Sequence, residues 1–295
     1  MAGLSYRSGV FLVLLAGSIW STSGLMVRLI HDAQVWQILF YRSVAMTPVL
    51  FIVITFRSHN HFLNTIRKAA IPSTVGAIGL VFAYAGGIFS LQATTVANAV
   101  FLFATAPFFA AVLSRILLSE KVRRATWIAI AFAGIGMLIM LWGGLASGRL
   151  IGNVAAVLSA IGFAVFTICL RWGKLEDMLP AVFLSGIITF FTAFMMCRFL
   201  ELTLSLSLWD TSVALLMGAF QLGLGLTLYT FGSRVLPAAE LALLSMTEVM
   251  LGPVWVWIIM GELAGAWTVA GGAILLASIA GNAISGIRQV PPKLI

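Results

Sequence analysis

Residues 89–120 have the sequence FSLQATTVANAVFLFATAPFFAAVLSRILLSE, and residues 231–262 have the sequence FGSRVLPAAELALLSMTEVMLGPVWVWIIMGE. The two stretches align without a gap, and the alignment pairs Thr105 with Thr247. Near the start of each half, Gly9 pairs with Gly152 at almost the same offset. Single identities are common in apolar sequence, but several pairs in the same order indicate an internal repeat. Further pairs are Phe89 with Phe231, Ala97 with Ala239, Leu102 with Leu244, Glu120 with Glu262, and Arg28 with Arg171.

The aligned stretches belong to a series of long apolar runs. A helix needs about 20 residues to cross the roughly 30 Å of hydrocarbon in a bilayer, because each residue rises about 1.5 Å. Ten runs are long enough, and we expect an all-α integral membrane protein with ten transmembrane helices. Their predicted limits are 9–29, 34–56, 69–91, 94–118, 125–144, 150–171, 179–200, 210–234, 238–260 and 265–286.

The composition excludes a soluble globular protein. Of the 295 residues, 61% are hydrophobic and only 9% are charged, against about 45–50% and about 25% in ordinary soluble proteins. So few charges cannot cover a surface that faces water on all sides. The net charge of +8 does not indicate a nucleic-acid partner, because the basic residues lie in the short gaps between apolar runs and form no clustered basic face.

The basic residues predict the orientation through the positive-inside rule. With a cytoplasmic N-terminus, thirteen Lys and Arg residues fall in inner segments and three fall in outer ones. The outer three are Arg28, Arg149 and Arg198. We therefore expect both termini in the cytoplasm.

Each half of the chain holds five predicted helices, in domains 1–146 and 147–295. Because five is odd, the second half enters the membrane from the opposite side, which makes the repeat an inverted one. Two inverted halves can open first to one side of the membrane and then to the other. This plan is more typical of transporters than of enzymes.

At these residues the sequence resembles a known family. The stretch from Asn98 through ATAPFFAAVLSRILLSEKV to Val122, its echo at Glu262, and Arg42 early in the second run are similar to the EamA family of the drug/metabolite transporter superfamily. The resemblance implies two EamA repeats over nearly the whole chain. The length and the aromatic-rich first half are most similar to the YddG-type bacterial amino-acid exporters. The second repeat departs from the pattern, because Val249 replaces Pro107.

Two ionisable residues lie inside predicted spans, where a charge costs roughly 2.5–3.5 kcal/mol on insertion scales. Glu248 lies in the middle of the ninth run. One interpretation is that it binds the ammonium group of a substrate, or a proton. The other is that it is a buried structural partner for Arg42 or for Ser and Thr groups. Arg42 lies about eight residues into the second run, as a structural or coupling charge or as a side chain that snorkels to the interface.

The fourth run carries Asn98 and Thr105 on one helical stripe, which should face protein or water and not lipid. Glu240 occupies the position equivalent to Asn98 in the second repeat, where it also suits the positive end of a helix.

Further polar or aromatic residues at membrane depth complete a predicted substrate site. Aromatic walls with a few hydrogen-bonding groups suit an amphipathic zwitterion. Each residue alone is better explained by ordinary hydrogen bonding between helices, so the prediction rests on the set. The predicted substrate-binding residues are Trp20, Tyr84, Asn98, Thr105, Phe163, Gln221, Tyr229 and Glu248.

Together these features predict a secondary transporter that exports small amphipathic metabolites, with amino acids and aromatic amino acids among them, by alternating access. Exporters of drugs or other metabolites, and an intramembrane enzyme, are the alternatives. The sequence has no HExxH or GxSxG motif and no GxxxxGK[ST] run, so we expect no enzyme activity, cofactor, metal site or ATP-driven transport. The expected partners are a small-molecule substrate and the lipid of a bacterial inner membrane, with no nucleic acid; the sequence sets no oligomeric state.

Overall fold

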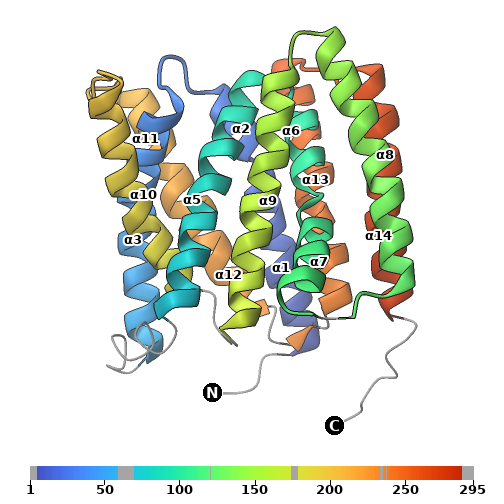
Figure 1. The fold of residues 1–295 in the computed structure, drawn as a ribbon. Coiled ribbons are helices and arrows are strands. Elements are labelled where there is room, and N and C mark those ends of the chain that lie inside the picture. The colour runs from blue at the N-terminus through green and yellow to red at the C-terminus, as the bar shows by residue number, and fades with distance from the viewer. Residues whose placement is uncertain are drawn as a thin grey trace.

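The computed structural model describes residues 5–58, 70–119, 121–173, 179–232, 235–236 and 238–287. Over these ranges the chain is helical, without strands, and the helices stand side by side (Figure 1). The first helix begins at Tyr6 and the last ends at Ile287 at the same end of the bundle, the lower one in Figure 1, which we call the terminal end. The opposite end, with the loops 29–34, 94–95, 147–149, 200–207 and 261–265, is the distal end.

The helix bounds agree with the predicted runs to within three residues at each end. By length and apolar composition, nine helices among the described residues are able to cross a membrane. The predicted ninth run is α13, in which the same criterion finds only the shorter apolar segment Met246–Met260, so the count of ten spans stays a prediction. The elements are α1 Tyr6–Ser21, α2 Ser23–Arg28, α3 Val35–Ser58, α5 Ala70–Ala93, α6 Val96–Phe103, α7 Ala106–Leu117, α8 Arg124–Ala146, α9 Leu150–Trp172, α10 Leu179–Phe199, α11 Leu208–Leu216, η1 Met217–Leu224, α12 Gly225–Gly232, α13 Ala238–Met260 and α14 Ala266–Ile287.

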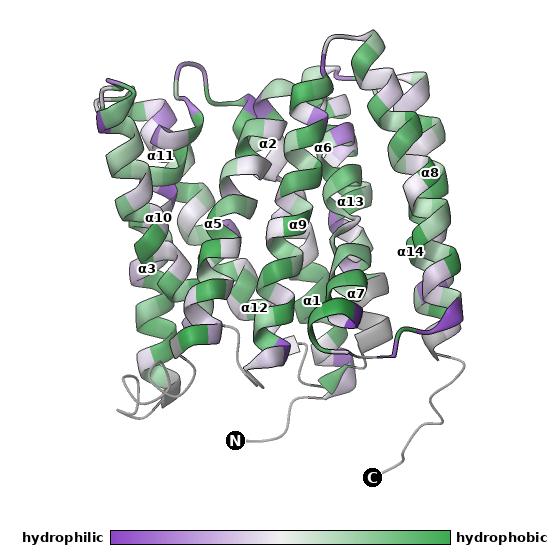
Figure 2. Cartoon of the chain, viewed as in Figure 1, coloured by the Kyte–Doolittle hydropathy of each residue, from purple (hydrophilic) through white to green (hydrophobic). Residues whose placement is uncertain are grey.

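The bundle is apolar on its outside. Green, hydrophobic residues cover most of the helices in Figure 2, with purple, hydrophilic residues gathered mainly near the two ends. Phe82 is 68% exposed and Leu138 is 67% exposed, whereas Asn153 in the interior is fully buried. An exterior of large apolar side chains around buried polar ones is expected of a protein surrounded by lipid. The chain is therefore a multi-pass membrane protein.

Three of the predicted helices are interrupted. The first breaks at Thr22 between α1 and α2, and the fourth breaks at Ala104 and Thr105, just before Pro107 in the first turn of α7. The eighth contains the π-helix η1, which carries Gln221. The sequence analysis treated each of these three segments as one run and assigned no break within it. Interrupted spans and π-helical turns occur mostly at functional positions, because they free backbone groups and redirect side chains.

Helices α5 and α9 approach closely where glycines face each other. A Cβ atom built on Gly162 would lie 2.7 Å from the carbonyl oxygen of Gly79 and 2.9 Å from the backbone nitrogen of Ala83. Helices α8 and α14 meet in the same way at Gly136 and Gly271. Without Cβ atoms the backbones come into direct contact, which is how membrane helices gain packing energy in lipid.

Replacing Gly162 by alanine will lower the stability of the protein, because the new methyl group meets backbone atoms that cannot turn aside. Overpacking of this kind costs about 1–3 kcal/mol. The matched control is Gly134→Ala on α8, where an added Cβ meets no atom within 4 Å. The apparent melting temperatures of the detergent-solubilised variants test this. Equal values for the two variants would show that the close approach of α5 and α9 does not contribute to stability.

The packing of helices follows a two-fold pattern. The pair α5 and α9 has a counterpart in α12 and α1, and the pair α6 and α9 has a counterpart in α13 and α1. Helices at equivalent places in the two halves also pack against each other, namely α3 with α10, α6 with α13 and α8 with α14. Such a pattern is expected of two halves related by a pseudo-two-fold axis.

Two individual contacts repeat in the same way. A Cβ atom on Gly9 would meet Val235 and Leu236, and one on Gly152 would meet Ala93 and Thr94. The alignment of the two halves pairs Gly9 with Gly152 and places residues 93 and 94 opposite residues 235 and 236. These contacts therefore support the predicted repeat, because Gly9 and Gly152 each rest on the turn after the third predicted helix of the other half.

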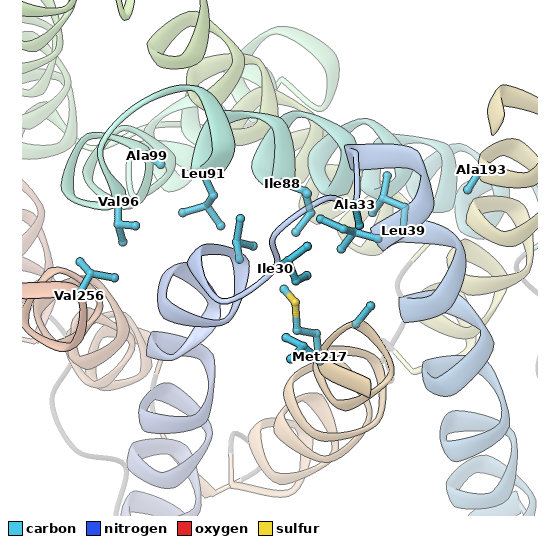
Figure 3. Packing of buried hydrophobic residues seen from close by; sticks show 14 residues of the cluster. Ile30, Ala33, Leu39, Ile88, Leu91, Val96, Ala99, Ala193, Met217 and Val256 are labelled. Carbon is cyan, nitrogen blue, oxygen red and sulfur yellow. The ribbon is translucent and has the colours of Figure 1, made fainter. Parts of the chain in front are cut away.

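The distal end is closed by a cluster of buried apolar residues. The cluster joins eight elements, α2, α3, α5, α6, α10, α11, η1 and α13, and includes Ile38, Val96 and Met217, each with no exposed surface. In Figure 3, Leu91 lies between Val96 and Ile30, and Met217 lies below Ile30. Because these elements come from both halves of the chain, the cluster holds the halves together at this end.

Candidate functional site

Arg42 on α3 has no ion-pair or hydrogen-bond partner in the described part of the chain. Its Nε atom is enclosed and unpaired, and its guanidinium carbon lies 5.1 Å from the ring centroid of Tyr84 on α5. The residue is surrounded by protein atoms but keeps some accessible surface, so the side chain faces the interior of the bundle and does not snorkel to the interface. The Tyr84 ring thus makes a cation–π contact with the Arg42 guanidinium.

Glu248 on α13 is an acidic residue in the interior, opposite in charge to Arg42. It too is surrounded by protein atoms and partly accessible, and among the described residues its carboxylate has no partner. The backbone of α13 at Glu248 lies against Gly17 of α1, where an added Cβ would be 3.7 Å from the Glu248 nitrogen. Arg42 and Glu248 form no ion pair, so the structure does not provide the mutual pairing that the sequence analysis kept open.

Trp20, Gln221 and Tyr229 come together between α1 and the eighth predicted helix. The Trp20 indole donates a hydrogen bond of 2.8 Å to the carbonyl oxygen of Gln221, and its ring lies 5.3 Å from that of Tyr229. The Gln221 amide nitrogen donates to the Thr22 hydroxyl, while its Oε1 atom is buried without a partner. The π-helix therefore presents its polar groups to the break between α1 and α2.

Asn98 lies in a buried polar network and not beside these groups. Its Oδ1 accepts a hydrogen bond of 2.6 Å from Thr268 on α14, and its amide nitrogen donates to Asn153 on α9 at 3.1 Å. Asn153 also accepts from Thr94, at 2.6 Å. With these partners Asn98 joins three helices, and its hydrogen-bonding groups are already engaged.

The remaining predicted residues occupy separate places. Thr105 is fully buried and donates to the carbonyl oxygen of Leu102 at the break between α6 and α7. Phe163 on α9 is 36% exposed, and its ring lies edge-on to Phe103 and tilted against Phe166. Glu240 lies in the first turn of α13, and its side chain falls outside the described residues.

The distal end carries an ion pair that the sequence analysis did not predict. Arg28 Nε donates to Glu262 Oε2 at 2.7 Å, and its other nitrogens donate to the carbonyl oxygens of Leu91 and Thr94. Glu262 Oε1 accepts from the backbone nitrogen of Val96 at 2.7 Å. One carboxylate thus connects the end of α2, the turn between α5 and α6, and the loop after α13. In the sequence, the one feature that could have indicated this ion pair is that Arg28 and Glu262 each have a counterpart in the repeat alignment.

Asp210 supports the same end. It is 1% exposed, and its two carboxylate oxygens accept hydrogen bonds from the backbone nitrogens of His31 and Asp32. Trp209 beside it donates to the carbonyl oxygen of Leu29. These contacts tie the loop after α2, in the first half, to the start of α11 in the second. A cavity of about 370 Å³ lies next to the ion pair and is lined by Arg28, Gln92, Ala93, Thr94, Thr95, Arg149, Glu262 and Leu263.

The fold and its interior define a multi-pass helical membrane protein with two charges at membrane depth, Arg42 and Glu248, for which the described residues provide no ion-pair partner. Residues 7–142 match the model of the EamA-like transporter family, so this part of the chain is similar to that family. This match supports the resemblance to EamA for the first half of the chain. A membrane transporter is the class of protein that this match supports.

The comparison with solved structures gives the fold alone. One structure, titled only "Crystal structure of protein", has a TM-score of 0.65 and 15% sequence identity, with 97% of this chain and 100% of that chain covered. No curated protein matches the chain. The described residues hold no group of three or more His, Cys, Asp or Glu side chains able to bind a metal ion.

Proposed function

We propose that the chain is a secondary transporter that exports small amphipathic zwitterions, with aromatic amino acids among them, across a bacterial inner membrane. It works by alternating access between two inverted repeats, 1–146 and 147–295, each with five spans. Both termini are cytoplasmic, as the thirteen inner Lys and Arg residues favour. The family match and the two-fold packing pattern support the repeat arrangement.

The observation that carries this proposal is the presence of Arg42 and Glu248 as opposite, unpartnered charges in the interior. Charged residues in membrane interiors are costly and usually pair, or mark the path of a substrate or ion. A molecule with an ammonium group, a carboxylate and an apolar side chain offers a partner for each charge. Trp20, Tyr84 and Tyr229 provide aromatic surface for its side chain.

The closed distal end is consistent with export from the cytoplasm. The apolar cluster and the Arg28–Glu262 pair join both halves there. With the terminal end in the cytoplasm, this is the state in which an exporter binds its substrate from inside. Export then requires the distal contacts to open.

Uptake by counterflow in proteoliposomes tests the function. Vesicles loaded with an unlabelled neutral amino acid and diluted into the labelled form should accumulate label above protein-free vesicles, most strongly for aromatic amino acids. An imposed pH gradient shows whether a proton is coupled to the movement. Accumulation of drugs or sugars without any amino acid would refute the substrate class. No accumulation of any solute would refute the transporter function.

A further inference from the structure

A groove runs along the outer face of α8 and α14 near the terminal end of the bundle. The two helices pack side by side at one edge of the bundle, and the start of α8 and the end of α14 both lie at the terminal end (Figure 1). The groove has a volume of about 500 Å³, within the roughly 300–1,000 Å³ of ligand-binding pockets. Its walls are formed by residues between Ala125 and Phe132 on α8 and between Ile274 and Ser285 on α14.

The groove faces the surrounding lipid and runs along the two helices. Ile128 is 60% exposed and Phe132 is 54% exposed, so this face belongs to the apolar exterior. From Ala125 to Phe132 the helix rises about 10 Å, at about 1.5 Å per residue. One leaflet contributes about half of the roughly 30 Å of hydrocarbon. The groove therefore begins near the interface and extends through most of one leaflet, along the course of an acyl chain.

Small residues on α14 keep the groove open and leave it without free hydroxyl groups. A Cβ atom added to Gly281 would meet no atom within 4 Å. The hydroxyl group of Ser278 donates to the carbonyl oxygen of Ile274, and that of Ser285 donates to the carbonyl oxygen of Asn282. Because both hydroxyls are satisfied within their own helix, the surface of the groove suits a hydrocarbon chain.

The terminal end of the groove carries positive charge. Arg123, at the N-cap of α8, donates from Nη2 to the side-chain and main-chain oxygens of Asn282, which lines the groove. Its Nη1 atom has no partner, and no carboxylate among the described residues forms an ion pair with it. Arg124 and Lys121 next to it in the chain are exposed. Uncompensated basic residues at the interface attract anionic lipid.

The start of α8 adds hydrogen-bond donors for an anion. Thr126 is the first residue of this helix whose backbone nitrogen has a backbone acceptor, the carbonyl oxygen of Arg123. No side chain caps the helix, so within the described ranges the backbone nitrogens of Arg124 and Ala125 have no acceptor. Ala125 also lines the groove. A phosphate group here would accept these N–H groups at the positive end of the helix dipole.

We propose that this groove binds one phospholipid with an anionic headgroup. One acyl chain lies in the groove between α8 and α14, and the phosphate lies at the start of α8, beside Arg123 and Arg124. The basic residues select an anionic headgroup over a zwitterionic one. This inference goes beyond the proposed function and does not depend on which solute is transported. With cytoplasmic termini, the lipid belongs to the inner leaflet.

Native mass spectrometry of the detergent-solubilised protein tests the headgroup selectivity. The probes are phosphatidylglycerol and phosphatidylcholine with the same acyl chains. The wild-type protein should bind one phosphatidylglycerol molecule at least about fivefold more tightly, which is the effect of one basic residue near an anionic lipid. Arg123→Gln should lower this preference several-fold. Arg7→Gln, which makes the same change on an exposed residue at the terminal end of α1, should keep it.

A second pair of variants tests the groove itself. Gly281→Leu places a side chain in the groove and should weaken the binding of both lipids by at least about tenfold, because the acyl chain loses apolar contact. Gly134→Leu on α8 is the matched control. A Cβ atom added there also meets no atom within 4 Å, but Gly134 does not line the groove. A loss confined to Gly281→Leu also excludes binding through the headgroup alone.

Three results would overturn the inference. They are equal binding of the two lipids by the wild type, an unchanged preference in Arg123→Gln and Arg124→Gln, and equal lipid binding by Gly281→Leu and Gly134→Leu. A lipid-free dimer that Gly281→Leu dissociates would assign the groove to a second copy of the chain and would also overturn it. If Arg123→Gln does not fold, because its contact with Asn282 is lost, the exposed Arg124→Gln decides: a lowered preference supports the site, and an unchanged one overturns it.

Discussion

Replacing Glu248 by glutamine will reduce amino-acid counterflow by at least about tenfold, because the amide keeps the shape of the side chain but loses the negative charge. Hydrogen bonds to charged groups contribute about 1.5–3 kcal/mol, and 1.4 kcal/mol corresponds to a factor of ten. The described residues offer the carboxylate no partner that the substitution would disturb. The folded protein should therefore remain stable, and the loss should appear in transport.

The control for this substitution is Glu201→Gln, which makes the same chemical change on an exposed residue of the distal end. It should leave counterflow unchanged. A pH gradient separates the two roles of Glu248. If the residue binds the ammonium group, Glu248→Gln raises the KM for substrate; if it carries a proton, exchange persists and its response to the gradient disappears. Unchanged flux together with an unchanged response would make Glu248 a structural residue.

Removing Glu262 will open the distal end. The substitution Glu262→Ala leaves the Arg28 guanidinium without its counter-charge and the backbone nitrogen of Val96 without its acceptor. Because the two side chains are 24% and 20% exposed, we expect a cost below that of a fully buried pair, about 2 kcal/mol. A change of this size shifts the balance between closed and open states by about thirtyfold.

A single cysteine reports this opening. In a background with Cys169 and Cys197 replaced by alanine, Val256→Cys places a thiol in the apolar cluster of the distal end, where Val256 is 1% exposed. An impermeant maleimide added from the distal side should label it at least about tenfold faster with Glu262→Ala than without. Glu201→Ala, on an exposed residue of the same end, is the control. Equal labelling rates would show that the ion pair does not hold this end closed.

The apolar runs alone were sufficient to predict where the helices begin and end, because a lipid-spanning helix needs an uninterrupted apolar length. They did not predict the π-helix η1. Its irregular turn is accompanied by tertiary contacts, such as the hydrogen bond from Trp20 to the Gln221 carbonyl and the close packing of Gly218 on the Arg42 backbone. Contacts of this kind join residues far apart in the sequence and leave no local pattern.

The candidate site was predicted only in part, and for a related reason. Helical periodicity shows which residues share a face, but not which helix lies opposite. The sequence therefore identified Trp20, Gln221 and Tyr229 without their contacts, and it grouped Asn98 with them although Asn98 belongs to the network with Asn153 and Thr268.

The most direct test of transport by alternating access is trans-stimulation of efflux. Proteoliposomes loaded with labelled phenylalanine are diluted into buffer with or without unlabelled phenylalanine. In alternating access, the binding site returns to the inside of the vesicle faster when it carries substrate than when it is empty. Unlabelled phenylalanine outside should therefore accelerate the release of label, and we predict this stimulation. Release that is fast but insensitive to outside substrate would indicate a channel, and release no faster than from protein-free vesicles would contradict transport of amino acids altogether.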